Sequence, residues 1–390
     1  MTKQRLEWLD ALRGFTMLMV VTNHVYGFGF DTNTKYSMFM SLCLLFRMPL
    51  FFFISGFLAY KATFSWNLRD TTDLIAKKLR VQIVPTVVFM TAEIALTAEV
   101  FWNKMEYAWT SPTKGGYWFT LVLLEMFLVY YAVCWLAAPR KPQTPQTPSP
   151  LPQGEDGHLS SKEGNMQNIP SSPERGAERG SVGIEEGVFF TLWALSLFAY
   201  ATLYMPKWFS WHKDAFWQAT SITELARYFH FFLLGNLVHR FWPQVKRLLD
   251  SRWFFPLLIA IAFLGAGDYL KWHNLRMHWA NLPRTMAMYA LVMIIVAFFR
   301  NYSSWFTRDT RLGSALQYIG VRTLDIYLIH YFFLPKLPDV GLWFKAHPNN
   351  FILEGTAALI IALLVIAFSI LTSHVLRVSP FLKKWLFGRE

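Results

Sequence analysis

Long apolar stretches recur along the 390-residue chain, and they limit its fold more than any other feature. A helix that crosses a membrane needs about 20 mostly apolar residues. Ten stretches meet this condition, at approximately 8–29, 37–60, 81–101, 117–138, 188–205, 223–239, 253–270, 282–299, 314–335 and 351–376. The sequence therefore predicts an all-α, polytopic membrane helix bundle of about ten transmembrane helices.

The composition agrees with lipid as the solvent of this chain. Charged residues make up 16% of it, against about 25% in an average soluble domain. The formal net charge is +12, and its basic residues lie between apolar stretches rather than along one soluble face. We attribute the excess to membrane topology and expect no nucleic-acid partner. Cys43 and Cys134 lie in apolar runs without metal-ligand or disulfide spacing, so we expect two core residues and no metal site.

The distribution of Lys and Arg predicts the orientation. An even number of spans puts both ends on one side, and the loops on that side carry more Lys and Arg, as the positive-inside rule requires of cytoplasmic loops. Asp10 and Arg13 interrupt the first stretch and no cleavage site follows, so we expect a retained span rather than a signal peptide. Both termini are predicted to be cytoplasmic, and the expected location is the bacterial inner membrane.

One segment breaks the apolar pattern. Residues 139–187 begin PRKPQTPQTPSPLPQG and continue rich in Ser, Glu and Gly. Such a segment buries too little apolar area to offset its chain entropy. We predict a disordered cytoplasmic linker here, between the motif-bearing helices 1–4 of residues 1–138 and helices 5–10 with a basic tail in residues 188–390.

Ionisable side chains within the apolar stretches are candidates for function, because their burial in lipid is costly. Arg13 and His24 are 11 residues apart in the first stretch, roughly 16 Å along a helix, and lie on a similar face. By depth, Glu125 matches His24, so its carboxylate could hold the imidazole in one tautomer. The alternative is that Glu125 neutralises one of the arginines Arg47, Arg227 and Arg284.

Two further groups of charged residues have open interpretations. Lys77, Lys78 and Arg80 precede the third stretch, either as a topology signal or as ligands for a phosphorylated molecule. Arg322 and Asp325 are three residues apart in the ninth stretch, where we favour an ion pair across one helical turn. Ser55 and His230 are more simply explained by packing than by chemistry.

The motifs, taken in order, resemble those of the acyltransferase-3 family of integral membrane acyltransferases. They are LDALRGFTMLMVVTNH, MPLFFFISGF, KKLRVQIVP, GYWFTLVLLEM, FHFFLLGNLV and TLDIYLIH, and they span nearly the whole chain except 139–187. Arg13 and His24 have the family's Arg-ten-His spacing. In one departure, Lys77 and Arg80 occupy positions where the family often has two arginines, and a lysine offers a point charge rather than a planar fork.

The resemblance implies an O-acyltransferase that moves an acyl group, commonly acetyl, from cytoplasmic acetyl-CoA or another acyl-CoA to a hydroxyl of a carbohydrate or small alcohol. It implies His24 as the catalytic residue and Arg13 as its companion. We add Glu125 as a catalytic residue, and place the acyl-CoA phosphates at Arg13, Lys77, Arg80 and Arg322. The choice of acetyl or succinyl, of direct transfer or an acyl-His intermediate, and of monomer or homodimer stays open.

Two other classes of function fit parts of the sequence. A transporter or flippase of a small anionic or glycan substrate also needs buried charge in many spans. It would leave acyl-CoA intact, whereas the enzyme releases free CoA. A membrane scaffold would depend on residues 139–187 for its partners.

Overall fold

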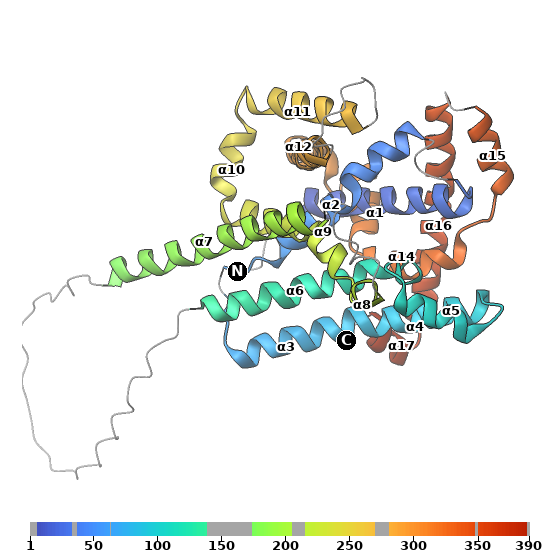
Figure 1. Ribbon diagram of the computed structural model, residues 1–390, viewed down its shortest axis with the longest axis horizontal. Coiled ribbons are helices and arrows are strands. Elements are labelled where there is room, and N and C mark those ends of the chain that lie inside the picture. The colour runs from blue at the N-terminus through green and yellow to red at the C-terminus, as the bar shows by residue number, and fades with distance from the viewer. Residues whose placement is uncertain are drawn as a thin grey trace, which may run out of the picture.

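The computed structural model describes residues 6–32, 37–62, 64–138, 174–204, 215–269, 281–347 and 350–387. Every regular element within these ranges is a helix (Figure 1), so the all-α prediction is confirmed for them. The first half contains α1 (Glu7–His24), η1 (Val25–Gly29), α2 (Met38–Ala59), α3 (Leu68–Lys78), η3 (Leu79–Ile83), α4 (Val84–Thr97), α5 (Phe101–Thr110), η4 (Lys114–Gly116) and α6 (Trp118–Ala137).

The second half continues with helices that surround and complete this core. They are α7 (Glu174–Ala199), η5 (Tyr200–Tyr204), α8 (Ala215–Ala219), α9 (Ile222–Arg240), α10 (Trp242–Leu249), α11 (Phe254–Tyr269), α12 (Asn281–Asn301), η7 (Ser303–Phe306), α13 (Arg311–Gly320), α14 (Thr323–Ile329), η8 (His330–Phe333), α15 (Pro338–Ala346), α16 (Phe351–Leu376) and α17 (Pro380–Phe387). In Figure 1, α1 and α2 lie between a group formed by α3, α4 and α6 and a group formed by α10, α11 and α12.

Several helices are long and apolar enough to cross a membrane. Among the described residues there are five, Met38–Ala59, Leu68–Thr97, Trp118–Ala137, Leu282–Asn301 and Phe351–Leu376. A sixth span results if α10 and α11, bent by 81° at their junction, count as one. The helices at the other predicted spans are shorter, broken or more polar. The chain is a multi-pass membrane protein, but by length and composition its described part does not reach the predicted ten spans.

Three predicted boundaries differ from the structure. The helix expected at 81–101 starts at α3, because the Asn67 side chain caps its first turn by accepting a hydrogen bond of 2.8 Å from the Asp70 backbone N–H. The span expected at 314–335 is broken between Gly320 and Thr323. Of the predicted linker, residues 139–173 lie outside the described residues, and helix α7 begins at Glu174, before the predicted end of the linker at 187.

Small residues let the central helices approach each other closely. A Cβ at Gly14 of α1 would lie 1.9 Å from the Leu316 carbonyl oxygen of α13, and one at Gly320 would lie 1.9 Å from the Asp10 carbonyl oxygen. Such contacts are typical of helix pairs in membranes, where packing replaces the hydrophobic effect between helices. Cys43 and Cys134 are buried and unbridged, as expected of core residues.

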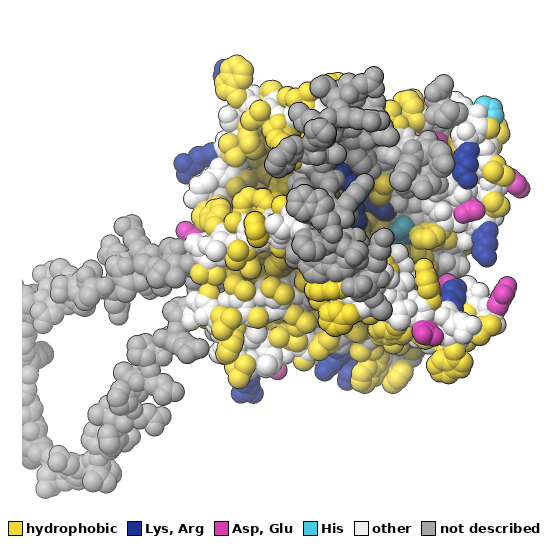
Figure 2. Space-filling view, in the orientation of Figure 1, with side chains coloured by type: hydrophobic (Ala, Val, Ile, Leu, Met, Phe, Trp, Pro, Cys, Tyr) yellow, Lys and Arg dark blue, Asp and Glu magenta, His cyan; other side chains and the backbone are white. Residues whose placement is uncertain are grey.

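The start of α1 and the end of α16 lie at the same end of the bundle. Arg13 of α1 donates a hydrogen bond of 3.2 Å to Thr323 of α14, and Asp325, half a turn further, pairs with Arg377 at the end of α16 at 2.5 Å. Figure 2 shows hydrophobic side chains over much of one face, with the charged side chains mainly near its edges.

Candidate active site

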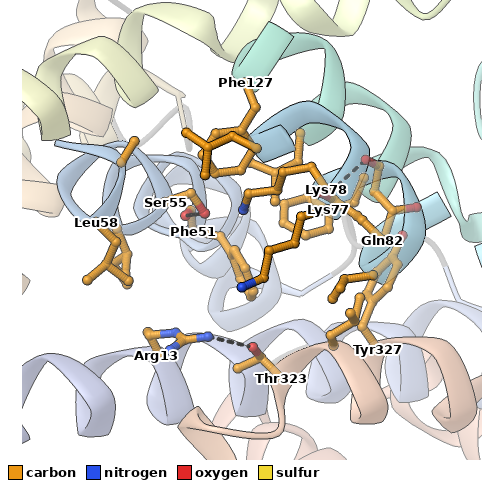
Figure 3. Close-up of a pocket in the computed structure, with 18 of the residues that line it drawn as sticks. Arg13, Phe51, Ser55, Leu58, Lys77, Lys78, Gln82, Phe127, Thr323 and Tyr327 are labelled. Carbon is orange, nitrogen blue, oxygen red and sulfur yellow. Dashed lines mark hydrogen bonds between the residues drawn. The ribbon is translucent and has the colours of Figure 1, made fainter. Parts of the chain in front are cut away.

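A pocket of about 420 Å³ lies between α1, α2, α3, α6 and α14 (Figure 3). Its walls are largely apolar, and aromatic side chains close its inner part, including Phe51, Phe119, Phe127 and Tyr327. Pockets of this size hold small organic ligands.

Four cationic side chains line this pocket, Arg13, Lys61, Lys77 and Lys78. Figure 3 shows Lys77 and Lys78 extending from α3 into the space between Ser55 and Arg13. The Lys78 ammonium lies 3.6 Å from the centre of the Phe127 ring, a cation–π contact. One end of an otherwise apolar pocket is therefore strongly positive, which suits an anionic ligand with an apolar arm.

Helix α3 and the π-helical turn η3 place the two lysines. Directly after them, the Gln82 side chain donates a hydrogen bond of 2.9 Å to the Thr120 carbonyl oxygen of α6. Thr86 adds a second link to α6 through the Thr120 hydroxyl, at 3.0 Å. These two bonds fix the helix against α6, and so hold Lys77 and Lys78 over the pocket.

The pocket includes some, but not all, of the residues predicted to bind acyl-CoA phosphates. Arg13 and Lys77 line it, whereas Arg80 is exposed and is not among its lining residues. Arg322 lies 3.8 Å from the centre of the Tyr318 ring, also outside the pocket. The predicted ion pair of Arg322 with Asp325 is wrong, because Asp325 bonds to Ser373 and Arg377 instead.

His24 forms a pair with a second histidine. Its Nδ1 lies 2.7 Å from Nε2 of His330, and the two rings stack with centroids 5.0 Å apart. The other nitrogen of His330, Nδ1, lies 2.7 Å from the Tyr327 carbonyl oxygen and 3.1 Å from that of Ile326. His330 is fully buried, whereas His24 is partly exposed.

The hydrogen bonds of this pair determine which nitrogens carry protons. Carbonyl oxygens only accept, so Nδ1 of His330 must donate. In a neutral ring the Nε2 of His330 then accepts, and Nδ1 of His24 must be its donor. The remaining nitrogen of His24, Nε2, therefore keeps its lone pair. A free imidazole lone pair is the feature required of a general base.

Tyrosines connect this pair to the pocket. Tyr331 stacks on His24, with centroids 5.4 Å apart, and its hydroxyl donates to the Gly116 carbonyl oxygen at 2.9 Å. Tyr327, which lines the pocket, donates to the same oxygen at 2.6 Å. Gly116 has a φ of +101°, and a Cβ there would lie 2.5 Å from the Tyr331 ring. The turn before α6 thus holds both tyrosines in place, Tyr327 in α14 and Tyr331 in η8.

Glu125 is not the hydrogen-bond partner of His24 in the structure, contrary to the pairing inferred from depth. The group that acts on it electrostatically is Lys114, whose ammonium donates to the carbonyl oxygens of Trp109, Ser111 and Gln218 at 2.8–2.9 Å. Burial lowers the pKa of Lys114, and the Glu125 carboxylate acts in the opposite direction. A catalytic role of Glu125 therefore stays a prediction.

Sequence reasoning assigned no role to His330 and Lys61, and it gave Lys78 only as part of a basic cluster with two open interpretations. For His330 a signal was present, because Thr323, Tyr327 and His330 recur at helical spacing in the late motif. Lys61 follows the end of α2 and gave no signal that links it to the pocket. Within the described ranges, no three His, Cys, Asp or Glu side chains come together as a set of metal ligands.

Comparison with known proteins agrees with this geometry. A family model described as an acyltransferase domain, that of the acyltransferase-3 family, matches residues 6–146 and 181–374. Neither characterised protein sequences nor solved structures gave a significant match. The matched segments cover nearly the whole chain and include every helix that lines the pocket or carries the histidine pair. The chain therefore belongs to the acyltransferase-3 family and is a multi-pass integral membrane acyltransferase.

Proposed function

We propose that this protein transfers an acyl group, in the first place acetyl, from cytoplasmic acyl-CoA to a hydroxyl of a carbohydrate or related small alcohol, with His24 as the general base. One observation carries the proposal. His24 is partly exposed and its Nε2 has no hydrogen-bond partner among the described residues, while Tyr327, whose ring lies 5.9 Å from that of His330, lines a pocket with an apolar interior and a cationic end. That combination fits a donor with phosphates at one end and a thioester at the other.

The donor would enter from the end of the bundle that holds both chain termini. Its phosphates would meet Arg13, Lys61, Lys77 and Lys78, which lie around the pocket. Ammonium and guanidinium groups bind phosphate through charge-assisted hydrogen bonds. The pantetheine arm would then run along the aromatic wall toward Tyr327, so that the thioester arrives beside His24 and Tyr331.

Transfer proceeds by addition to the thioester carbon and elimination of CoA. The acceptor oxygen forms a bond to the thioester carbon, while the hydroxyl proton moves to Nε2 of His24. The carbonyl electron pair moves onto its oxygen and returns as the C–S bond breaks. The CoA thiolate leaves and takes the proton from His24, which restores the base. General-base catalysis contributes about 10²–10⁴-fold to such a step.

The test is release of CoA thiol by the purified protein in detergent, with a panel of acyl-CoAs, with and without candidate glycans. We expect thiol release that depends on an acceptor, and a loss of about 10²–10⁴-fold in His24→Ala. His347→Ala is the matched control, since His347 is exposed and its Nδ1 bonds to the Trp343 carbonyl oxygen of α15. Its activity should equal that of the wild type.

Two results separate this function from its alternatives. A folded His24→Ala protein with an unchanged transfer rate would exclude His24 as base and as acyl carrier. A wild-type protein that binds acyl-CoA, releases no thiol and moves solute with an ion gradient would be a transporter. An acyl-His intermediate predicts that the donor alone adds the mass of one acyl group to the protein, whereas direct transfer predicts no added mass.

A further inference from the structure

Arg47 is a partly exposed cation whose Nε and Nη1 atoms are buried, and no counterion for it lies among the residues that the structure describes. It lies in the middle of α2, and its Nε and Nη1 atoms have no access to solvent and no hydrogen-bond partner among the residues that the structure describes. An arginine cannot lose its proton in a protein, so the charge persists. A charge inside the membrane region without a partner is costly, and such residues usually serve function.

The surroundings of Arg47 supply no negative charge in the described part of the chain. The groups that act on it electrostatically are Tyr228, Cys43, Tyr331 and Arg227. The first three are neutral in this setting, and the fourth is a cation. Two carboxylates of neighbouring helices have other partners. Glu224 pairs with Arg227 at 3.4 Å, and Glu125 interacts with Lys114.

The position of Arg47 connects it to the pocket. Phe51, Ser55 and Leu58 follow it by 4, 8 and 11 residues on α2, and all three line the pocket (Figure 3). These spacings put the four residues on one helical face. Arg47 therefore extends the pocket wall by one turn, about 6 Å beyond Phe51.

That turn points toward the histidine pair. The beginning of α2 packs against the end of α1, where the Asn23 amide contacts the Met40 sulfur at 4.0 Å. Arg47 interacts electrostatically with His24 and with Tyr331, which stacks on His24. The Arg47 guanidinium is thus one helical turn beyond Phe51 and acts on His24 and Tyr331, which is where we place the reacting acyl group.

We propose that Arg47 binds the carbonyl oxygen of the acyl group while this oxygen becomes an oxyanion during transfer. The proposal rests on the acyl transfer proposed above. When the acceptor oxygen attacks, the carbonyl π pair moves onto the oxygen, and its negative charge meets the N–H donors of Arg47. The charge disappears when the C=O bond re-forms and the C–S bond to CoA breaks. The thioester oxygen is neutral before attack, so Arg47 stabilises the transition state more than the bound donor.

Arg47→Met tests the proposal, because it removes the charge and keeps a long side chain. We expect kcat to fall about 10²–10³-fold, the usual effect of losing an oxyanion donor, with little change in the KM for acyl-CoA. We also expect an unchanged or higher midpoint of thermal unfolding, since an uncompensated buried charge is gone. Arg47→Lys retains a charge without the planar fork, so its kcat should lie between those of the wild type and Arg47→Met at an unchanged KM.

Arg247→Met is the matched control, because Arg247 is exposed on α10, away from the pocket. Its kcat and KM should equal those of the wild type. The proposal is overturned if Arg47→Met keeps the wild-type kcat, or if either Arg47 variant raises KM at constant kcat, which indicates binding of a ground-state anion. It is also overturned if Arg47→Met unfolds at a lower temperature or fails to fold, since Arg47 would then support the fold. Thiol release by the wild type is measured first, so that failure of the enzyme assay is recognised separately.

Discussion

Which nitrogen of His24 carries the proton is decided by His330. The chain of bonds runs from the Tyr327 carbonyl through both rings and ends at Nε2 of His24. Without an acceptor at Nδ1, His24 could adopt the other neutral tautomer, in which Nε2 carries the proton and cannot act as a base. His330 is therefore a positioning residue for the proposed reaction.

Replacing His330 should separate positioning from binding. His330→Leu removes the acceptor, and we expect kcat to fall on the order of 10²-fold while the KM for acyl-CoA stays constant, because His330 does not line the pocket. His330→Gln offers an amide oxygen to Nδ1 of His24 and should restore part of the rate. The check is the pH dependence of kcat for the three proteins. Equal rates in His330→Leu and the wild type would contradict the positioning role.

The sequence can predict how far along its helix a side chain lies, but not which neighbouring helix that side chain faces. Residue number fixes how far along a helix a side chain lies, so the cationic end of the pocket could be anticipated from Arg13 and Lys77. The side of the bundle that a residue faces depends on how helices pack, and no spacing within one helix contains that information. Glu125 matches His24 in depth, yet the ring partner of His24 comes from η8.

Helix crossings explain why small residues occur where they do. At Gly320 the backbones of α13 and α1 are so close that even a methyl group would overlap the Asp10 carbonyl oxygen, at 1.9 Å. Three residues later, Thr323 accepts the hydrogen bond from Arg13. The α1–α13 contact therefore also positions one cation of the pocket.

Gly320→Ala should push α13 away from α1. We expect the free energy of unfolding to fall by about 1–3 kcal/mol, the usual range for overpacking, together with weaker donor binding as Arg13 shifts. Thermal unfolding measures the loss of stability, and the KM for acyl-CoA in the thiol-release assay, in the same detergent, measures the weaker donor binding. Gly187→Ala is the control, because a Cβ there meets nothing within 4 Å. A Gly320→Ala protein as stable as this control would disprove the close contact.

Hydropathy does not predict where the helices begin and end. Hydropathy located the apolar core of each helix, but the start at Leu68 depends on the Asn67 cap, which is a polar signal. The break after Gly320 lies within an apolar stretch and is stabilised by contacts with α1 and α16 that are remote in sequence. Local composition contains no information on the contact of Gly320 with α1 or on the ion pair with Arg377 at the end of α16.

For the whole molecule, composition was a sufficient guide to class. A content of 16% charged residues, together with long apolar stretches, predicted a helical membrane protein. Five of the described helices are long and apolar enough to cross a membrane. The number of spans was less accessible, because α1 carries Glu7, Asp10 and Arg13 and is less apolar than the long spans. A helix that carries charged residues to the pocket is less apolar than an ordinary membrane span, so a hydropathy threshold does not count it.

The net charge of +12 leads to a prediction about salt. Acyl-CoA is polyanionic, and its proposed site has Arg13, Lys61, Lys77 and Lys78 around an opening to water. The Debye length falls from about 10 Å at 0.1 M ionic strength to about 3 Å at 1 M, so added salt should weaken capture of the donor. We expect the KM for acyl-CoA to rise several-fold over this range at a nearly constant kcat, because the reacting groups lie deeper than the opening. Acyl-pantetheine lacks most of the negative charge, and its KM should hardly respond. If both donors respond equally, salt acts on the detergent-solubilised fold rather than on phosphate binding, and the cationic end of the pocket is not the entrance for CoA.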